Sequence, residues 1–315
     1  MNKEELYKRQ AELLISVLPH IKLEECFALK GGTAINFFVR DLPRLSVDID
    51  LTYIGFENRD IAFKNINNAL ERISTKLKKA NLKTTISTYS NEIKKVLCSS
   101  NFAEIKIEPN YNSRGYIYCP KVMPITEKIV DKYGVFLDSN IIATAELYGG
   151  KIHAAVSRQH PRDLFDIKIL FQEEGGITQE IKKAFIYTVL ADNSTPYELL
   201  NPTIKDQRQT LENNFYGMTD IEFTYKDHEQ TLQKLIKTLH NSFTKEDREF
   251  ILSFYSLNPK WDLVNIPNIQ RLPAIQWKFI NLQKMSKSQL DNQLEKIQLA
   301  FDACLVKNVD YSLEL

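Results

Sequence analysis

Apolar and polar residues along this chain follow two periods, and each period predicts one kind of element. Residues 3–18 and 59–80 carry apolar side chains at helical spacing, which is typical of amphipathic helices. Because Pro19 follows the first stretch, we expect that helix to end there. Strand patterns follow at residues 82–89, 94–98 and 101–109. The first half of the chain therefore predicts an α+β fold.

The second half of the chain is predicted to be helical. From Thr178 onward, helical patterns are separated by Asn201-Pro202 and Asn258-Pro259, which break helices. We expect helices at residues 181–190, 207–215, 227–243 and 245–255. The residues expected in the core of this half include Trp277, Phe279 and Ile280. We therefore expect a domain boundary between residues 172 and 173.

Residues 27–54 contain most of the candidate chemistry. The apolar run from Phe27 to Leu29 stops at Gly31-Gly32-Thr33, and helical spacing follows over residues 34–39. Glycines at such a turn leave room for a ligand close to the backbone, and the N-terminus of the following helix attracts anions. This order of strand, turn and helix predicts a phosphate-binding segment made of Gly31, Gly32 and Thr33.

Two aspartates lie on the strand pattern that follows this turn. Asp48 and Asp50 alternate with apolar residues, so both carboxylates face the same side of the strand. Carboxylates this close raise each other's pKa unless a cation lies between them, and oxygen ligands favour magnesium or manganese. Arg44 and Ser46 share this face and add a guanidinium and a hydroxyl. A glycine pair or an Asp-x-Asp strand alone is usually structural, but together they predict a metal–nucleotide site.

The order of a Gly-Gly turn and an Asp-x-Asp strand resembles the nucleotidyltransferase superfamily related to DNA polymerase β. The strings GGTA at residues 31–34 and LPRLSVDIDL at residues 42–51 resemble in particular the AbiEii/AbiGii type of bacterial nucleotidyltransferase toxin, a group that includes the MenT toxins. The resemblance implies a polymerase-β-like nucleotidyltransferase domain, a mixed sheet flanked by helices, over residues 1–172. It implies a mainly α-helical second domain over residues 173–315.

The resemblance also implies a third carboxylate on a strand beside the Asp-x-Asp strand. In residues 101–109, Glu104 and Glu108 face the side opposite to the apolar residues. Glu108 fits the family's pattern best as the third metal ligand, and Glu104 remains the alternative. Pro109 stands where the family has an apolar residue, so we expect the strand to bend there.

Residues 141–170 predict two helices separated by a polar break at residues 158–161. Lys151 is a single cation on an otherwise apolar helix, and a buried ammonium is costly without an anion beside it. The anion is expected to be a phosphate or a carboxylate, and Asp166 is the candidate carboxylate. Lys151 and the RDxxDI string of the next helix resemble the remaining signature of the AbiEii-type family.

Two further features of this stretch lead to structural expectations. Asp163, at the start of the second helix, is expected to complement the helix dipole and to pair with Arg162. Gly149-Gly150 departs from the alanine-rich helix of the family and predicts a kink before Lys151.

Composition and charge narrow the class of protein. A chain of 315 residues that is 43% hydrophobic can bury a large core, and a net charge of +1 leaves any attraction to nucleic acid to local basic patches. No apolar run reaches the length of a membrane span, so we expect a cytoplasmic protein with no membrane partner. The cysteines are widely spaced, which predicts reduced thiols instead of disulfides or zinc ligands: Cys26, Cys98, Cys119 and Cys304.

The resemblance implies transfer of a nucleoside monophosphate from an NTP, with release of pyrophosphate. The residues that it makes catalytic are Asp48, Asp50, Lys151 and Asp166. The nucleotide-binding residues are Gly31, Gly32, Thr33, Arg44 and Ser46. The ligands of magnesium or manganese are Asp48, Asp50 and Glu108.

The resemblance further implies a biological setting for this reaction. The acceptor would be the 3′ end of tRNA, and the chain would be the toxin of a toxin–antitoxin or abortive-infection pair whose cognate antitoxin acts with or without a stable complex. The RNA backbone would lie along basic residues at 76–83, at Arg158 with Arg162, and at 271–284. Two alternatives stay open: transfer to a protein or small-molecule hydroxyl, and a non-catalytic NTP- or RNA-binding module with the same fold.

Overall fold

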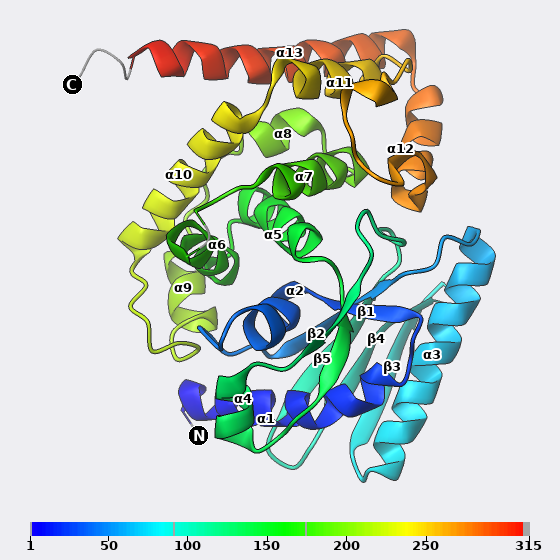
Figure 1. The fold of residues 1–315 in the computed structure, drawn as a ribbon, viewed down its shortest axis with the longest axis vertical. Coiled ribbons are helices and arrows are strands. Elements are labelled where there is room, and N and C mark those ends of the chain that lie inside the picture. The colour runs from blue at the N-terminus through cyan, green and yellow to red at the C-terminus, as the bar shows by residue number, and fades with distance from the viewer. Residues whose placement is uncertain (1, 91, 174, 311–315) are drawn as a thin grey trace. The chain divides into compact units, whose positions relative to one another are not determined.

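A mixed sheet organises the first part of the chain in a computed structural model that describes residues 2–90, 92–173 and 175–310, the last eight by backbone alone (Figure 1). Within these residues the sheet has seven strands in the order β3-β4-β5-β2-β1-β7-β6. The strands are β1 (Phe27–Lys30), β2 (Asp48–Tyr53), β3 (Lys83–Tyr89), β4 (Glu92–Ser99), β5 (Glu104–Asn110), β6 (Lys121–Pro124) and β7 (Asp138–Ile141). Strand β2 is antiparallel to β1 and parallel to β5, so the expected mixed sheet is confirmed.

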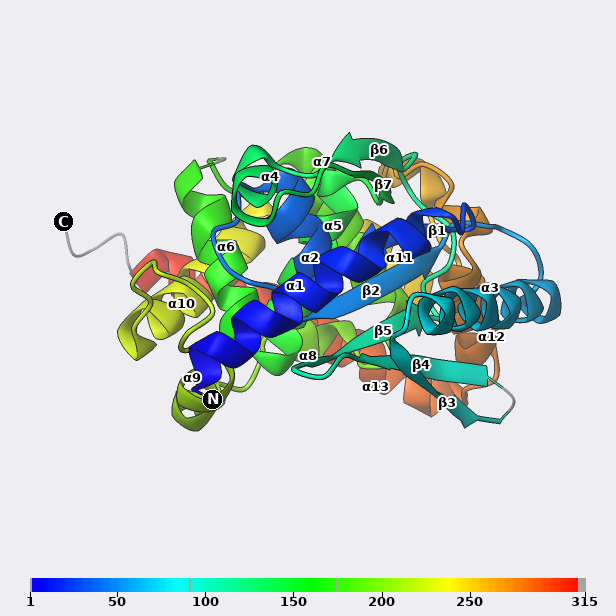
Figure 2. The same cartoon turned by 90° about the horizontal axis from the view of Figure 1, so that it is seen from below.

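The two faces of this sheet differ in polarity. Ile49 of β2 and Ile105 and Ile107 of β5 are buried, and helices α1 (Lys3–Lys22) and α3 (Arg59–Lys79) pack against β5 and β4. Helices α1 and α3 also contact each other, and Figure 2 shows both of them. On the opposite face, Asp48 and Asp50 of β2 and Glu104, Lys106 and Glu108 of β5 are not fully buried. The alternation predicted from the sequence therefore separates a core face from a polar face.

The chain after β1 turns at once into helix. Helix α2 (Gly31–Ala34) begins with the glycines themselves and continues as a π-helical segment, Ile35–Val39. The expected helix over residues 34–39 therefore starts earlier. A short helix, α4 (Glu127–Tyr133), lies between β6 and β7.

Of two expectations about proline, the end of the first helix at Pro19 was wrong and a bend of the strand at Pro109 stays a prediction. Pro19 does not end α1, which continues to Lys22. The helix tolerates the loss of one backbone N–H because its last turns bury Val17, Leu18 and Ile21. Pro109 lies within β5, paired with Leu51 of β2.

The second half of the chain is helical, as expected. Its α-helices are α5 (Thr144–Arg158), α6 (Pro161–Glu173), α7 (Gln179–Ala191), α8 (Pro196–Leu200), α9 (Arg208–Asn214), α10 (Tyr225–Ser242), α11 (Lys245–Tyr255), α12 (Pro273–Gln283) and α13 (Lys287–Asp310). Thr224 and Thr244 begin α10 and α11 with capping boxes, which explains why these two boundaries follow the sequence closely.

The chain divides into two compact units. One consists of Met1–Leu147 with Phe215–Glu222, and the other consists of Tyr148–Asn214 with Phe223–Leu315. This division falls within α5, whereas the sequence places a boundary at residues 172 and 173. The nucleotidyltransferase domain over residues 1–172 and the helical domain over 173–315 therefore stay predictions about functional parts. No described helix has the length and apolar content of a membrane span.

Helix α5 runs unbroken through Gly149 and Gly150, and a kink before Lys151 stays a prediction. Gly149 has another role, because a β-carbon there would lie 2.7 Å from the β-carbon of Ala184 and 2.8 Å from the backbone of α7. The missing side chain allows α5 and α7 to pack closely, which is the reason for glycine at this position.

The core assignments in α12 were partly wrong. Trp277 and Ile280 are 57% and 44% exposed, whereas the Phe279 ring packs at 5.5 Å from that of Phe254. The buried side of α12 is formed by Ala274, Ile275 and Leu282. Of the cysteines, Cys26, Cys98 and Cys119 are free thiols, as expected, and the side chain of Cys304 lies outside the described residues.

Candidate functional site

The glycine turn is packed against acidic and basic side chains. Gly31 has φ +70°, and a β-carbon there would lie 1.9 Å from Oδ2 of Asp50. A β-carbon on Gly32 would lie 2.8 Å from Nη2 of Arg44 and 3.2 Å from Oγ of Ser46. Only glycine at residue 31 satisfies both the backbone conformation and the contact with Asp50. Three residues predicted from the sequence, Asp50, Arg44 and Ser46, therefore lie around this turn.

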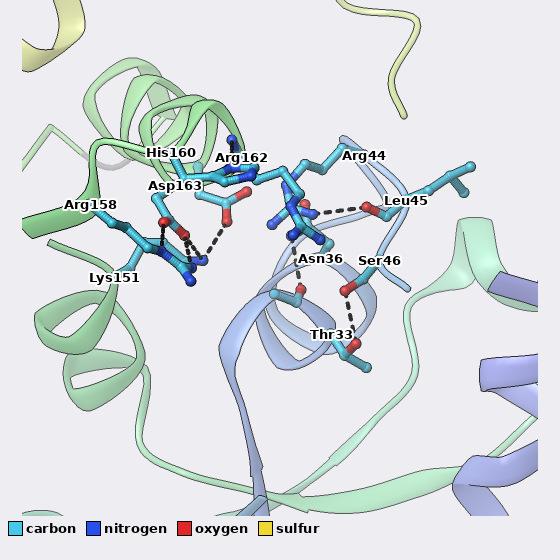
Figure 3. Close-up of polar contacts among 12 residues, drawn as sticks. Thr33, Asn36, Arg44, Leu45, Ser46, Lys151, Arg158, His160, Arg162 and Asp163 are labelled. Carbon is cyan, nitrogen blue, oxygen red and sulfur yellow. Dashed lines mark hydrogen bonds and ion pairs between the residues drawn. The ribbon is translucent and has the colours of Figure 1, made fainter. Parts of the chain in front are cut away.

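Hydroxyl groups join the turn to strand β2 (Figure 3). The Thr33 hydroxyl donates to the main-chain carbonyl of Asp48 at 2.6 Å and lies 2.9 Å from Oγ of Ser46. Asn36, which no sequence pattern identified as a site residue, donates to the carbonyl of Gly32 at 2.9 Å. These contacts hold the start of α2 against the strand that carries the aspartates.

Arg44 and Ser46 are buried supports of the turn. Their side chains are 3% and 5% exposed, and Nη1 of Arg44 donates to the carbonyl of Leu45 at 2.8 Å. The guanidinium therefore contributes a fixed positive charge beneath Gly32.

The candidate metal ligands share one face of the sheet. Asp48 and Asp50 lie two positions apart on β2, and Glu108 of β5 is the register partner of Asp50. Glu104 lies outside the residues of β5 that pair with β2, and its carboxylate accepts a hydrogen bond from Ser99 at 2.8 Å. Of the two glutamates, Glu108 is the one next to an aspartate.

The donor set suits a hard cation shared with a nucleotide. Among the residues that the structure describes, no three His, Cys, Asp or Glu side chains converge as a complete metal site. Magnesium is commonly held by one or two carboxylates together with substrate phosphates, so Asp48 and Asp50 beside a phosphate-sized turn fit this ion.

Another acidic residue near the glycine turn, Glu146, was not predicted from the sequence. Glu146, in the first turn of α5, accepts hydrogen bonds from the backbone N–H groups of Ile117 and Tyr118 at 3.0 and 2.8 Å. Burial raises the pKa of Glu146 to about 7, and these two N–H groups and the charge of Lys30 oppose the rise. Lys30 directly precedes Gly31, so this acid borders the glycine turn. Its sequence signal, an acid in a first helical turn, is too common to single it out.

Lys151 lies in a buried ionic cluster of the second unit (Figure 3). Its Nζ is 2.9 Å from Oδ1 of Asp163 and 3.0 Å from Oδ2 of Asp166, and all three side chains are at least 93% buried. The expected partnership of Lys151 and Asp166 is confirmed as a contact. Arg158 also donates to both carboxylate oxygens of Asp163, at 2.6 and 3.0 Å.

The expectation that Asp163 complements the helix dipole and pairs with Arg162 was incomplete, because Lys151 and Arg158 also contact it. Burial pushes its pKa upward, but the charges and hydrogen bonds of Lys151 and Arg158 hold the pKa of Asp163 below its ordinary value. Asp163 is therefore an anionic link between two cations. Its inward position depends on how α5 and α6 meet after the break at residues 159 and 160, which helical periodicity alone does not determine.

The predicted site residues thus form one group in each unit. The first unit contains Gly31, Gly32, Thr33, Arg44, Ser46, Asp48, Asp50 and Glu108, and the second contains Lys151 and Asp166. Two of the expected RNA-binding cations are engaged elsewhere, because Lys76 pairs with Glu24 at 3.0 Å and Arg158 pairs with Asp163.

Comparisons with known proteins point to one family. The family model described as nucleotidyl transferase AbiEii toxin, type IV toxin–antitoxin system, matches residues 12–279. MenT4, a nucleotidyltransferase toxin from Mycobacterium tuberculosis H37Rv, has a similar structure, with a TM-score of 0.54 and 13% sequence identity over 94% of this chain and 99% of that chain. This likeness supports the α+β fold. No curated protein matches the chain.

Proposed function

Because the chain belongs to the AbiEii family of nucleotidyltransferase toxins from type IV toxin–antitoxin systems, we propose that it transfers a nucleoside monophosphate from an NTP to the 3′ end of tRNA. Pyrophosphate would be released, and loss of functional tRNA would stop translation and growth. The family implies an NTP substrate and an antitoxin, and we propose that the cognate antitoxin counteracts the toxin without a stable complex. NTP and tRNA are both available in the cytoplasm, where we propose that the protein acts.

One observation carries most of this proposal. Asp50 lies against the glycine turn at Gly31 and is the register partner of Glu108. The carboxylate of Asp50 therefore lies next to the backbone segment that would contact phosphates. It also lies next to a second carboxylate, that of Glu108.

Asp48, Asp50 and Glu108 would hold a divalent metal, magnesium or manganese, which would neutralise phosphate charge and favour ionisation of the acceptor hydroxyl. Gly31 and Gly32 leave space for the triphosphate, and Thr33 and Ser46 fix the turn to β2.

The basic residues would stabilise negative charge on the triphosphate. Arg44 contributes its charge from beneath Gly32. Lys151 would be a further cation for the phosphates, and Asp163 and Asp166 orient its ammonium group. Charge stabilisation of this kind is the main catalytic contribution in phosphoryl transfer, because the protein supplies little covalent chemistry.

The test is a labelling reaction. Purified protein is incubated with each of the NTPs, labelled at the α-phosphate, and with total tRNA, and the label is located after RNase and protease digestion. We expect label at the 3′ end of tRNA for the wild type and none for the Asp50→Asn variant. Label in protein or in a small molecule, with tRNA unlabelled, would disprove the tRNA acceptor and leave the nucleotidyltransferase assignment in place.

A further inference from the structure

The polar face of the sheet continues from the aspartates across three more strands. Asp48 of β2 is the register partner of Lys106 of β5, Lys106 pairs with Leu97 of β4, and Leu97 pairs with Thr85 of β3. Register partners share a face, so these side chains form one row that starts at the candidate metal site. None of them is buried, and Thr85 and Lys106 are exposed. We name the side of β5, β4 and β3 that contains this row the open face.

Three lysines lie on the open face, one on each strand. They are Lys106 of β5, Lys95 of β4 and Lys83 of β3, which share the parity of the row. Lys106 and Lys83 are exposed and Lys95 is half-buried. Among the described residues, none of these lysines has a hydrogen bond or ion pair, whereas Lys76 on the other side of the sheet pairs with Glu24 and Lys94 pairs with Glu92.

Protection of a sheet edge does not account for all three lysines. Natural edge strands often carry lysine against aggregation, and β3 is an edge strand, so Lys83 alone would fit that role. Strands β4 and β5 are interior, however, and Lys95 and Lys106 lie on them. Glu104 is an acidic group on the same face, and its carboxylate is hydrogen-bonded by Ser99.

We propose that the open face binds the single-stranded 3′ segment of the RNA acceptor, with the phosphates at Lys106, Lys95 and Lys83 and the terminal hydroxyl at Asp48 and Asp50. This inference rests on the proposed function and identifies the surface by which that site receives RNA. Charge complementarity favours an anionic polymer, and the continuity of the row with the aspartates gives the polymer its direction. The threonine and serine side chains of β3, Thr85 and Ser87, offer hydroxyl groups beside the lysines.

The dimensions of the face match a short strand of RNA. Neighbouring strands are about 4.8 Å apart, so the three intervals from β2 to β3 span about 14 Å, a distance that a few nucleotides cover. Lys106 lies one interval from the aspartates and Lys83 lies three intervals away. The lysines should therefore contact successive phosphates counted from the 3′ end.

The test compares two triple variants of the full-length protein with equal charge. The open-face variant carries Lys83→Gln, Lys95→Gln and Lys106→Gln. The control variant carries Lys64→Gln, Lys287→Gln and Lys296→Gln, which remove three exposed lysines from α3 and α13, outside the open face and outside the basic stretches at 76–83 and 271–284. Each variant lowers the net charge of +1 by three. A non-specific electrostatic effect would change both variants equally.

Binding is measured with a short single-stranded RNA that has a free 3′ hydroxyl, over a range of salt concentrations. For the open-face variant we expect weaker binding. The slope of log K against log salt concentration should be smaller in magnitude by about 2, because each lost phosphate contact on a single strand contributes about 0.7 to that slope. The control variant should bind RNA as the wild type does. Equal loss in both variants, or a parallel loss of NTP affinity in the open-face variant, would overturn the inference.

Single substitutions test the direction of the strand. As the RNA is shortened from its 5′ end, the effect of Lys83→Gln on KM should disappear first and that of Lys106→Gln last. If the lysine substitutions weakened the binding of duplex RNA but not of single-stranded RNA, the single-stranded assignment would be overturned. Labelling of tRNA by the wild type with no difference between the triple variants would overturn this inference and keep the proposed function. Absence of both RNA binding and RNA labelling in the wild type would overturn both.

Discussion

Gly31 and Asp50 are in such close contact that a methyl group on Gly31 would lie 1.9 Å from the carboxylate oxygen Oδ2 of Asp50. The turn and the acid therefore constrain each other. Any larger side chain at residue 31 would displace the carboxylate that borders the candidate phosphate site. Glycine is required at the first position of the turn more strictly than at Gly32, because only Gly31 has a positive φ and because a β-carbon at Gly32 would lie 2.8 Å from its nearest neighbour, Nη2 of Arg44.

Gly31→Ala should abolish NTP turnover. The substitution combines a left-handed backbone, which costs about 1–2 kcal/mol for an alanine, with a clash that moves Asp50. We expect turnover to fall by about 100-fold or more, the effect of losing one positioned charge-stabilising group. Turnover and urea unfolding are measured on the same preparation.

Gly134→Ala is the matched control for Gly31→Ala. Gly134 ends α4 with a φ of +64°, close to the +70° of Gly31, and a β-carbon there would meet nothing within 4 Å. It should lose stability through backbone strain alone and keep its turnover. Equal losses of unfolding free energy in the two variants, with turnover retained by Gly31→Ala, would show that the clash with Asp50 is unimportant.

Lys151→Met should lower both stability and activity. The variant leaves Asp163 and Asp166 buried without the ammonium group that contacts both, and removal of one partner from a buried ionic cluster costs about 3–5 kcal/mol. The free energy of unfolding is measured by urea denaturation. A second substitution, Asp166→Asn, should restore part of the stability without restoring turnover.

Lys182→Met separates a structural role of Lys151 from a catalytic one. Lys182 is also a buried lysine, and it pairs with Asp247. Both variants should be destabilised, but at a temperature where both remain folded only Lys151→Met should lack turnover. Similar residual turnover in the two variants would assign the buried lysine of α5 to folding alone.

The parts of this protein that could be predicted are those that depend on short sequence separations. The parity of Asp48 and Asp50 follows from strand geometry, and the pairing of Lys151 with Asp166 follows from the cost of a buried ammonium. The role of Glu146 depends instead on a loop that returns to α5 with the N–H groups of residues 117 and 118. No local sequence pattern predicts this contact between the loop and Glu146.

The positions of Pro109 and Trp277 both depend on tertiary context. Strand β4 pairs with β5 only as far as Ile107, so Pro109 lies beyond that pairing, where its missing N–H costs little. In α12 the inward side includes Lys278, whose Nζ donates to the carbonyl of Asp192 at 2.7 Å, and this orientation leaves Trp277 outside. Both outcomes depend on neighbouring elements and not on the intrinsic preference of the residue.

Asp48→Asn and Asp50→Asn should each reduce turnover by about 100-fold or more while the fold is retained. Both changes are nearly isosteric, and removal of one of two neighbouring carboxylates relieves their repulsion. The melting temperature without metal should therefore be equal to or higher than that of the wild type. Turnover close to the wild-type rate in both variants would disprove their role as metal ligands.

Glu108→Gln and Glu104→Gln form a matched pair on one strand. Only Glu108 is the register partner of an aspartate, whereas Glu104 is bonded to Ser99. We expect Glu108→Gln to raise the magnesium or manganese concentration needed for half-maximal turnover and Glu104→Gln to leave it unchanged. The opposite ranking would make Glu104 the third carboxylate.

Glu146 should make the stability of the protein depend on pH near neutrality. Its pKa is raised from 4.5 to about 7 in the folded state, so the folded protein binds this proton more tightly than the unfolded chain does. The corresponding stability is fully present below about pH 4.5 and is lost as the pH rises to about 7. The loss is at most about 3.5 kcal/mol, since each unit of pKa shift corresponds to about 1.4 kcal/mol.

Glu146→Gln removes this titration but keeps a side-chain oxygen that can accept from the N–H groups of Ile117 and Tyr118. Unfolding free energies are measured in urea between about pH 5 and about pH 8, with Glu127→Gln, an exposed first-turn acid of α4, as the control for lost charge. The stability of Glu146→Gln relative to the wild type should increase with pH, because only the wild type has to bury a carboxylate charge. Lys30 and the two N–H groups offset only part of that cost. A difference that stays constant across this range would show that Glu146 titrates alike in the folded and unfolded states.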